Sequence, residues 1–249
     1  MNGILNDITK SFNSYNKTVN KEVVALNKSL IAVAVVITGV LFLLEMLSWV
    51  KYFKSNNGEM TWKFFLEVAY KYIIALFFIY NSGIIADSIL YVANVIAKLA
   101  GANLSDDVFK FNLAKKGNFI VRGAINIMGF FVGGVAVLIS KILVLMRFVE
   151  LYVLKAVAPI FIAFMMNDET KSIAYSFFRR LAAVAFQGAL IILLLVIWQK
   201  TSISDAVNYS KASWLGYFAT PMSYLAKCIV FIILMVGTQR LSKSLFQAN

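Results

Sequence analysis

Long apolar runs separated by short polar stretches dominate the chain. The runs occupy residues 30–50, 64–82, 125–166, 181–198 and 221–238. A helix needs roughly 20 apolar residues to cross a hydrocarbon core about 30 Å thick. Transmembrane β-strands would instead alternate between apolar and polar positions. The pattern therefore predicts an all-α fold, a polytopic helical membrane protein with one transmembrane domain over residues 30–246.

The run at 125–166 is too long for a single crossing, since one helix of this length would extend about 63 Å. A tight turn near residues 147–150 would divide it into spans at 125–146 and 148–166, giving about six transmembrane helices. A single long helix that protrudes from the membrane would give five. No glycine or proline marks a turn between 147 and 150.

The positions of lysine and arginine favour six spans. Basic residues accumulate in cytoplasmic loops. With six spans and both termini inside, most of the basic residues outside the runs become cytoplasmic, including Lys115, Lys116, Arg179 and Arg180. With five spans the last two loops and the tail change sides and the bias weakens. We therefore expect both termini to be cytoplasmic.

Two further segments have amphipathic patterns. Residues 1–29 place apolar side chains at heptad spacing opposite lysines, which predicts an amphipathic N-terminal helix. It could lie on an anionic cytoplasmic leaflet, dock on a partner, or pack on its own domain. Residues 84–99 form a short apolar run with one polar stripe, which favours an interfacial helix. The apolar N-terminal positions are Leu5, Ile8, Phe12, Tyr15, Val19 and Leu26, and the stripe is Asp87, Tyr91, Asn94 and Lys98.

Composition argues against an enzyme. The chain contains no histidine, and Cys228 is its only cysteine. The commonest general base, an intrachain disulfide and a thiolate metal cluster are thus excluded, and no phosphate- or dinucleotide-binding fingerprint is present. We expect no catalytic residue, no cofactor and no metal. The net charge of +12 follows from membrane topology more simply than from nucleic-acid binding.

Several charged residues lie inside the apolar runs, where they are costly unless paired or near a helix end. Glu67 and Lys71 are four residues apart and could pair, or could extend to the interface. Arg147 and Glu150 could pair at a turn, and Lys155 follows them. These five are the candidate intramembrane polar residues.

Small residues in the long run suggest close helix packing. Gly129 and Gly133 are four residues apart, and Gly134 is adjacent. Such a face allows another helix to approach closely. Pro159 lies within the predicted span 148–166, where it should free a backbone carbonyl and bend the helix.

The segment 155–198 resembles the TrbL-like family of polytopic inner-membrane channel components of type IV secretion and conjugation systems. The resemblance consists of Lys-Ala-Val-Ala-Pro-Ile-Phe-Ile-Ala-Phe at 155–164, a short polar turn, Phe-Phe-Arg-Arg-Leu-Ala at 177–182, and a long aliphatic run. The chain is short for this family and lacks the large extramembrane extension of many members.

The resemblance implies a subunit of a DNA- or protein-translocating channel in a bacterial cytoplasmic membrane. Such a subunit would be a scaffold or conduit, would assemble with itself, with other membrane subunits and with the secretion ATPase, and could contact the transferred DNA or protein. The alternative is a stand-alone small-solute transporter or ion channel, with pairs such as Glu67–Lys71 or Glu150–Lys155 lining a pocket.

Overall fold

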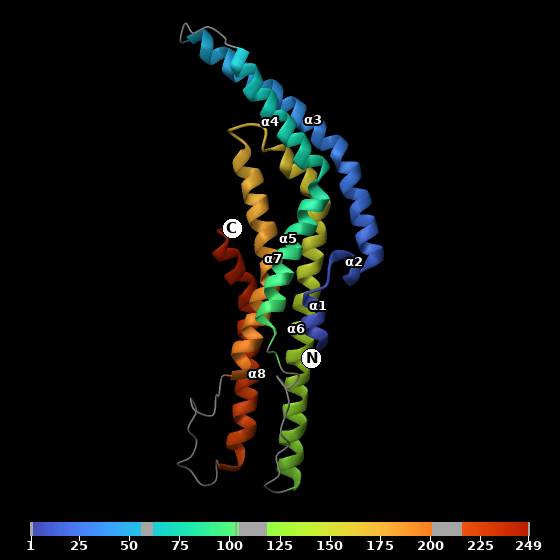
Figure 1. Cartoon of the computed structure of the whole chain (residues 1–249). Coiled ribbons are helices and arrows are strands. Elements are labelled where there is room, and N and C mark those ends of the chain that lie inside the picture. Colours follow the sequence, from blue (N-terminus) through green and yellow to red (C-terminus); the bar gives the residue numbers. More distant parts are fainter. Residues whose placement is uncertain (1, 56–61, 103, 105–118, 201–215, 249) are drawn as a thin grey trace. The chain divides into compact units, whose positions relative to one another are not determined.

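The computed structural model describes residues 2–55, 62–102, 104, 119–200 and 216–248, and all regular structure in these ranges is helical (Figure 1). This result confirms the predicted all-α class. The helices are α1 (Asn2–Ile8), α2 (Phe12–Tyr15), α3 (Lys17–Ser55), α4 (Trp62–Tyr80), α5 (Ser82–Ala100), α6 (Phe119–Ala163), α7 (Lys171–Lys200) and α8 (Gly216–Leu245).

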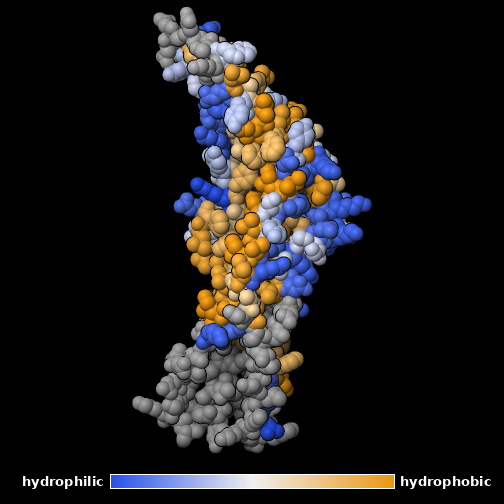
Figure 2. Space-filling model, in the orientation of Figure 1, coloured by the Kyte–Doolittle hydropathy of each residue, from blue (hydrophilic) through white to orange (hydrophobic). Residues whose placement is uncertain are grey.

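Five of the described helices are long and apolar enough to cross a membrane, which identifies a multi-pass helical membrane protein. The segments are Lys17–Lys54, Ser82–Ala100, Asn126–Ala163, Lys171–Lys200 and Cys228–Leu245. Large apolar side chains such as Leu43, Phe130 and Ile233 are exposed on them, as lipid-facing side chains would be. Figure 2 shows apolar side chains gathered over much of one face.

Helix α6 corrects the six-span prediction. It runs without a break for 45 residues through Arg147 and Glu150, so the predicted turn is wrong and the spans 125–146 and 148–166 belong to one helix. Its length is about 68 Å at 1.5 Å per residue. The residues at 147–150 include neither glycine nor proline, so nothing local ends the helix there.

Helices α4 and α5 also form one nearly continuous rod. The amide of Asn81 donates to the Phe77 carbonyl at 3.2 Å, and the Ile85 amide donates to the Asn81 carbonyl at 3.0 Å. Helical hydrogen bonds therefore continue across the junction between α4 and α5. The predicted interfacial helix 84–99 begins at Ser82 instead and, at 19 residues, is long enough to span.

The N-terminal segment is three helices and not the single amphipathic helix predicted over residues 1–29. The Ser11 hydroxyl caps α2 by accepting from the Ser14 amide. The Asn16 side chain caps α3 by accepting from the Val19 amide at 3.0 Å, and α3 then continues into the first span. Serine and asparagine at these positions compete with a continuous helix. Ile8 and Phe12 are buried, in agreement with the alternative in which this segment packs on its own chain.

The chain divides into two compact units, each containing parts of α6 and α7. Unit 1 comprises Met1–Thr9, Asn94–Arg147 and Phe186–Ser242, and unit 2 comprises Lys10–Ala93, Phe148–Ala185 and Lys243–Asn249. In unit 2, Leu41 of α3 packs with Val68 and Ala75 of α4 and with Met166.

In unit 1, the small residues of α6 form a buried stripe. Gly129 and Gly133 are buried, and the stripe continues through Ala136 and Ser140, which have no exposed surface. Gly134 is exposed, and a Cβ added there would meet nothing within 4 Å. Gly129 and Gly133 therefore pack within their own chain, whereas Gly134 faces outward.

The continuity of α6 can be tested by a cysteine scan of residues 140–154 in a Cys228→Ala background. We expect reactivity with a membrane-permeant thiol reagent to rise and fall every three to four positions, because one face of the helix is buried throughout. A run of four consecutive accessible positions at 147–150 would instead indicate a turn. Gly134→Cys serves as the exposed reference position.

Candidate functional site

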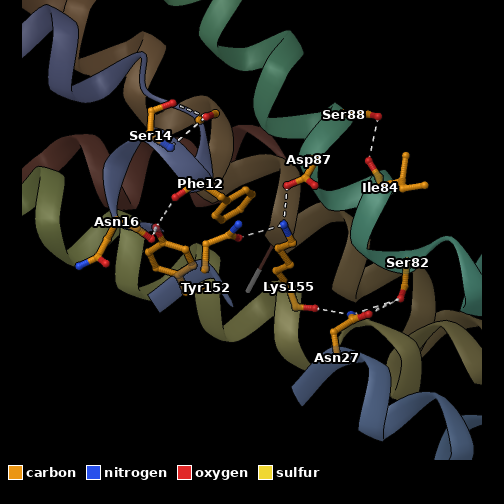
Figure 3. A network of polar contacts seen from close by, with 12 residues as sticks. Phe12, Ser14, Asn16, Asn27, Ser82, Ile84, Asp87, Ser88, Tyr152 and Lys155 are labelled. Atoms are coloured by element: carbon orange, nitrogen blue, oxygen red, sulfur yellow. Dashed lines mark hydrogen bonds and ion pairs between the residues drawn. The ribbon is translucent and has the colours of Figure 1, made fainter. Parts of the chain in front are cut away.

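A buried polar network surrounds Lys155 on α6 (Figure 3). The Lys155 ammonium is 2.6 Å from a carboxylate oxygen of Asp87 on α5 and donates to the Asn20 side chain of α3 at 3.3 Å. It also lies 4.6 Å from the centre of the Phe12 ring. A buried ammonium needs compensation of this kind, from a carboxylate, an acceptor and an aromatic face.

The backbone of Lys155 is part of the same network because of Pro159. Proline has no N–H, so the carbonyl four residues earlier loses its intrahelical donor, and that carbonyl is the one of Lys155. The Asn27 amide of α3 donates to it at 2.7 Å and also bonds the Ser82 hydroxyl at 3.2 Å. The predicted freed carbonyl is therefore satisfied by a neighbouring helix.

Tyr152 joins the N-terminal segment to α6 one turn before Lys155. Its hydroxyl donates to the Phe12 carbonyl at 2.6 Å and lies 3.3 Å from the Asn16 carbonyl. The Tyr15 ring stacks on Phe148, with centroids 3.8 Å apart. These contacts add to the backbone hydrogen bonds that the two carbonyls already accept, from the Asn16 amide at 3.3 Å and from the Asn20 amide at 3.0 Å.

In unit 1, Arg147 binds the end of α1. Its guanidinium is buried and donates to the Ile8 carbonyl at 3.0 Å. A cation is favourable at a helix C-terminus. A Cβ added at Gly188 of α7 would collide with this guanidinium, so a larger residue there would require the Arg147 side chain to move. Sequence reasoning identified Arg147 but had no signal for Gly188.

Glu150 is bound by residues from other helices. Arg180 of α7 donates to it from Nε at 3.2 Å and from Nη2 at 3.0 Å, and Lys243 of α8 lies 3.8 Å away. The sequence suggested that Arg147 and Glu150 pair at a turn and that Glu150 and Lys155 pair in a transport pocket. The partners of Lys155 and Arg147 are instead Asp87 and the Ile8 carbonyl.

A second cluster joins α3 and α4 to the loop after α6. Lys71 lies 3.1 Å from Asp168 and 3.6 Å from Glu45, while Glu67, its predicted partner, is exposed. Hydrogen bonds from Lys171 and Lys71 lower the pKa of Asp168. A lowered carboxyl pKa stabilises the fold at neutral pH, and this contribution is lost as the pH falls through the lowered value.

The predicted cytoplasmic basic residues divide into two groups. Lys115 and Lys116 lie outside the described residues. Arg179 and Arg180 are exposed and lie within α7, which begins at Lys171. The stretch 167–180 between the predicted spans 148–166 and 181–198 is therefore mostly helix, and α7 begins well before residue 181.

The polar contacts in these clusters join one helix to another. In both units, charges and freed backbone groups of α6 are matched by groups from helices distant in sequence. Within the described ranges, no set of three histidine, cysteine, aspartate or glutamate residues could hold a metal ion. No protein-family model, curated protein or solved structure matches the chain.

The Asn27–Pro159 relation can be tested with a double-mutant cycle. Asn27→Leu leaves the Lys155 carbonyl buried without a donor, which should cost about 1–3 kcal/mol of unfolding free energy. Pro159→Ala restores an N–H that can reach this carbonyl, so Asn27→Leu should cost less in that background. Unfolding in mild detergent measures both costs. Equal costs in the two backgrounds would contradict the pairing, and Ser82→Ala controls for the loss of the Asn27–Ser82 bond.

The Lys155–Asp87 pair should respond asymmetrically to neutralisation. The Lys155 side chain is 3% exposed and that of Asp87 is 52% exposed. Asp87→Asn leaves a buried ammonium without its carboxylate, whereas Lys155→Met leaves a carboxylate that water can reach. We expect Asp87→Asn to lower the unfolding temperature more than Lys155→Met, because an unpaired buried charge carries the larger penalty. The opposite order would show that Lys155 is hydrated in solution.

Proposed function

We propose that this chain is an integral membrane subunit of a type IV secretion channel for conjugative DNA or protein transfer. It acts as a scaffold or conduit in a bacterial cytoplasmic membrane. The supporting observation is that the end of α6, the connection and most of α7 make up the segment 155–198 that resembles the TrbL-like family. Pro159, the short connection at 164–170 and the apolar α7 all belong to it, and α7 is the most buried of the five candidate spans.

The burial of the charges also favours a scaffold. Lys155, Glu150 and Lys71 each have partners from other helices, so they join the helices of one subunit and are not held ready for a solute. The proposed partners are the lipid bilayer, further copies of the chain, the other membrane subunits, the secretion ATPase and the transferred DNA or protein.

The number of crossings bears on orientation. Five helices that each cross once place the two termini on opposite sides, whereas the expectation of two cytoplasmic termini depended on a turn within α6. With five crossings, the lysines of residues 10–28 and the basic residues of 98–122 still favour a cytoplasmic N-terminus. We therefore propose a cytoplasmic N-terminus and an external C-terminus.

A second candidate function is a stand-alone transporter or ion channel. The observation that favours it is the half-exposed Asp87 beside the buried Lys155, since a partly accessible ion pair within spanning helices is typical of transport sites. Under this reading Asp87→Asn abolishes transport while the protein stays folded.

The decisive experiment is purification from the native host in mild detergent, followed by mass spectrometry of the complex. The proposal predicts co-purification of a secretion ATPase and other membrane subunits, and loss of conjugative transfer on deletion of the chain. Glu67→Gln should restore transfer to the deletion strain as well as the unaltered chain does, because Glu67 is exposed. A lone monomer that moves solute across liposomes, with transfer unaffected by deletion, would favour the transporter.

A further inference from the structure

A groove of about 350 Å³ lies between α6 and α7 in unit 2. One side of it is apolar and includes Leu154, Phe161 and Phe177. The rings of Phe161 and Phe177 are stacked, with centroids 5.1 Å apart and planes 4° from parallel. This side of the groove therefore has the character of a hydrocarbon-binding surface.

The groove also has polar lining residues, which come from α7. Ser172, Ser176 and Arg180 line it, and their spacing of four residues places them above one another on the helix. The groove thus presents two hydroxyls and a guanidinium beside apolar side chains. This arrangement suits a ligand that has both a polar group and methylenes.

Arg180 can bind a further acceptor. Its side chain is 54% exposed, and the bonds to Glu150 involve Nε and Nη2. A guanidinium carries five N–H groups, so donors remain after Glu150 is satisfied. Lys243 also lies 3.8 Å from Glu150, so this carboxylate faces two cations. The groove edge keeps a positive charge.

The depth of these residues suits a lipid headgroup. Helix α7 has 30 residues and extends about 45 Å, the thickness of a bilayer including its headgroups. Arg179 and Arg180 directly precede the apolar run 181–198, which places Arg180 near the boundary of the hydrocarbon core. Basic grooves between spanning helices at this depth bind anionic headgroups.

We propose that this groove binds the headgroup of an anionic phospholipid. Arg180 binds the phosphate through charge-assisted hydrogen bonds, and Ser176 and Ser172, which precede Arg180 on α7 and so lie farther from the hydrocarbon core, bind further oxygens of the headgroup. The floor formed by Phe161 and Phe177 contacts the carbon atoms of the headgroup. A free phosphate ion has no apolar part to cover this floor, so a lipid is the better occupant. This inference does not depend on the proposed secretion function.

The test uses the full chain in a neutral detergent with phosphatidylglycerol or phosphatidylcholine added, and native mass spectrometry counts the bound lipids. We expect phosphatidylglycerol to be retained at least tenfold more than phosphatidylcholine. Arg180→Gln should remove this preference. Arg179→Gln is the matched control, because it removes the same charge one position away and does not line the groove. It should change retention less than twofold.

A second variant, Ile173→Trp, tests the role of the groove independently of the charge of Arg180. Ile173 lines the groove and is 40% exposed, so a larger side chain there should fill the groove while the Arg180–Glu150 pair stays intact. We expect it to lose phosphatidylglycerol as Arg180→Gln does. Equal losses in Arg179→Gln and Arg180→Gln, unchanged retention in Ile173→Trp, or equal competition by glycerol phosphate alone would each overturn the proposal.

Discussion

The carbonyl that Pro159 frees on Lys155 is the constraint on which unit 2 depends. An unsatisfied carbonyl away from water costs several kcal/mol in an apolar medium, on the order of a lost hydrogen bond in hydrocarbon. Helix α6 cannot supply the donor itself, so Asn27 of α3 does, and Ser82 at the start of α5 orients that amide. These hydrogen bonds at Lys155 thereby fix the positions of α3, α5 and α6 along their axes.

Polar contacts of this kind determine which helices associate in a membrane protein. Lipid tails are as apolar as leucine, so burial of apolar side chains gives little preference between a helix partner and the bilayer. The ion pairs of Lys155 with Asp87 and of Glu150 with Arg180 each join residues far apart in sequence. These ion pairs determine which helices pack together, whereas the exposed apolar faces of the same helices contact lipid.

The sequence predicted the helical class and identified several network residues, but it could not identify their partners. Pro159 and Lys155 were visible as a proline and a charge in an apolar run. Asn27 could not be identified from the sequence. It lies in a stretch rich in asparagine and lysine, and nothing there distinguishes the one amide that faces a freed carbonyl. Arg147 and Glu150 suggested a turn for a related reason. Both charges are accommodated by tertiary contacts, which a single sequence does not display.

The energetic cost of Pro159 bears on how this part of α6 is held in unit 2. A proline inside a helix costs about 3 kcal/mol or more, and alanine at 159 would supply the missing N–H without any help from Asn27. Here the freed carbonyl accepts from Asn27 of α3, and the Tyr152 hydroxyl one turn earlier donates to the Phe12 carbonyl of α2. Each of these bonds joins α6 to a segment far away in the sequence. The proline is thus accommodated by contacts with α2 and α3, and these contacts hold this part of α6 in place within unit 2.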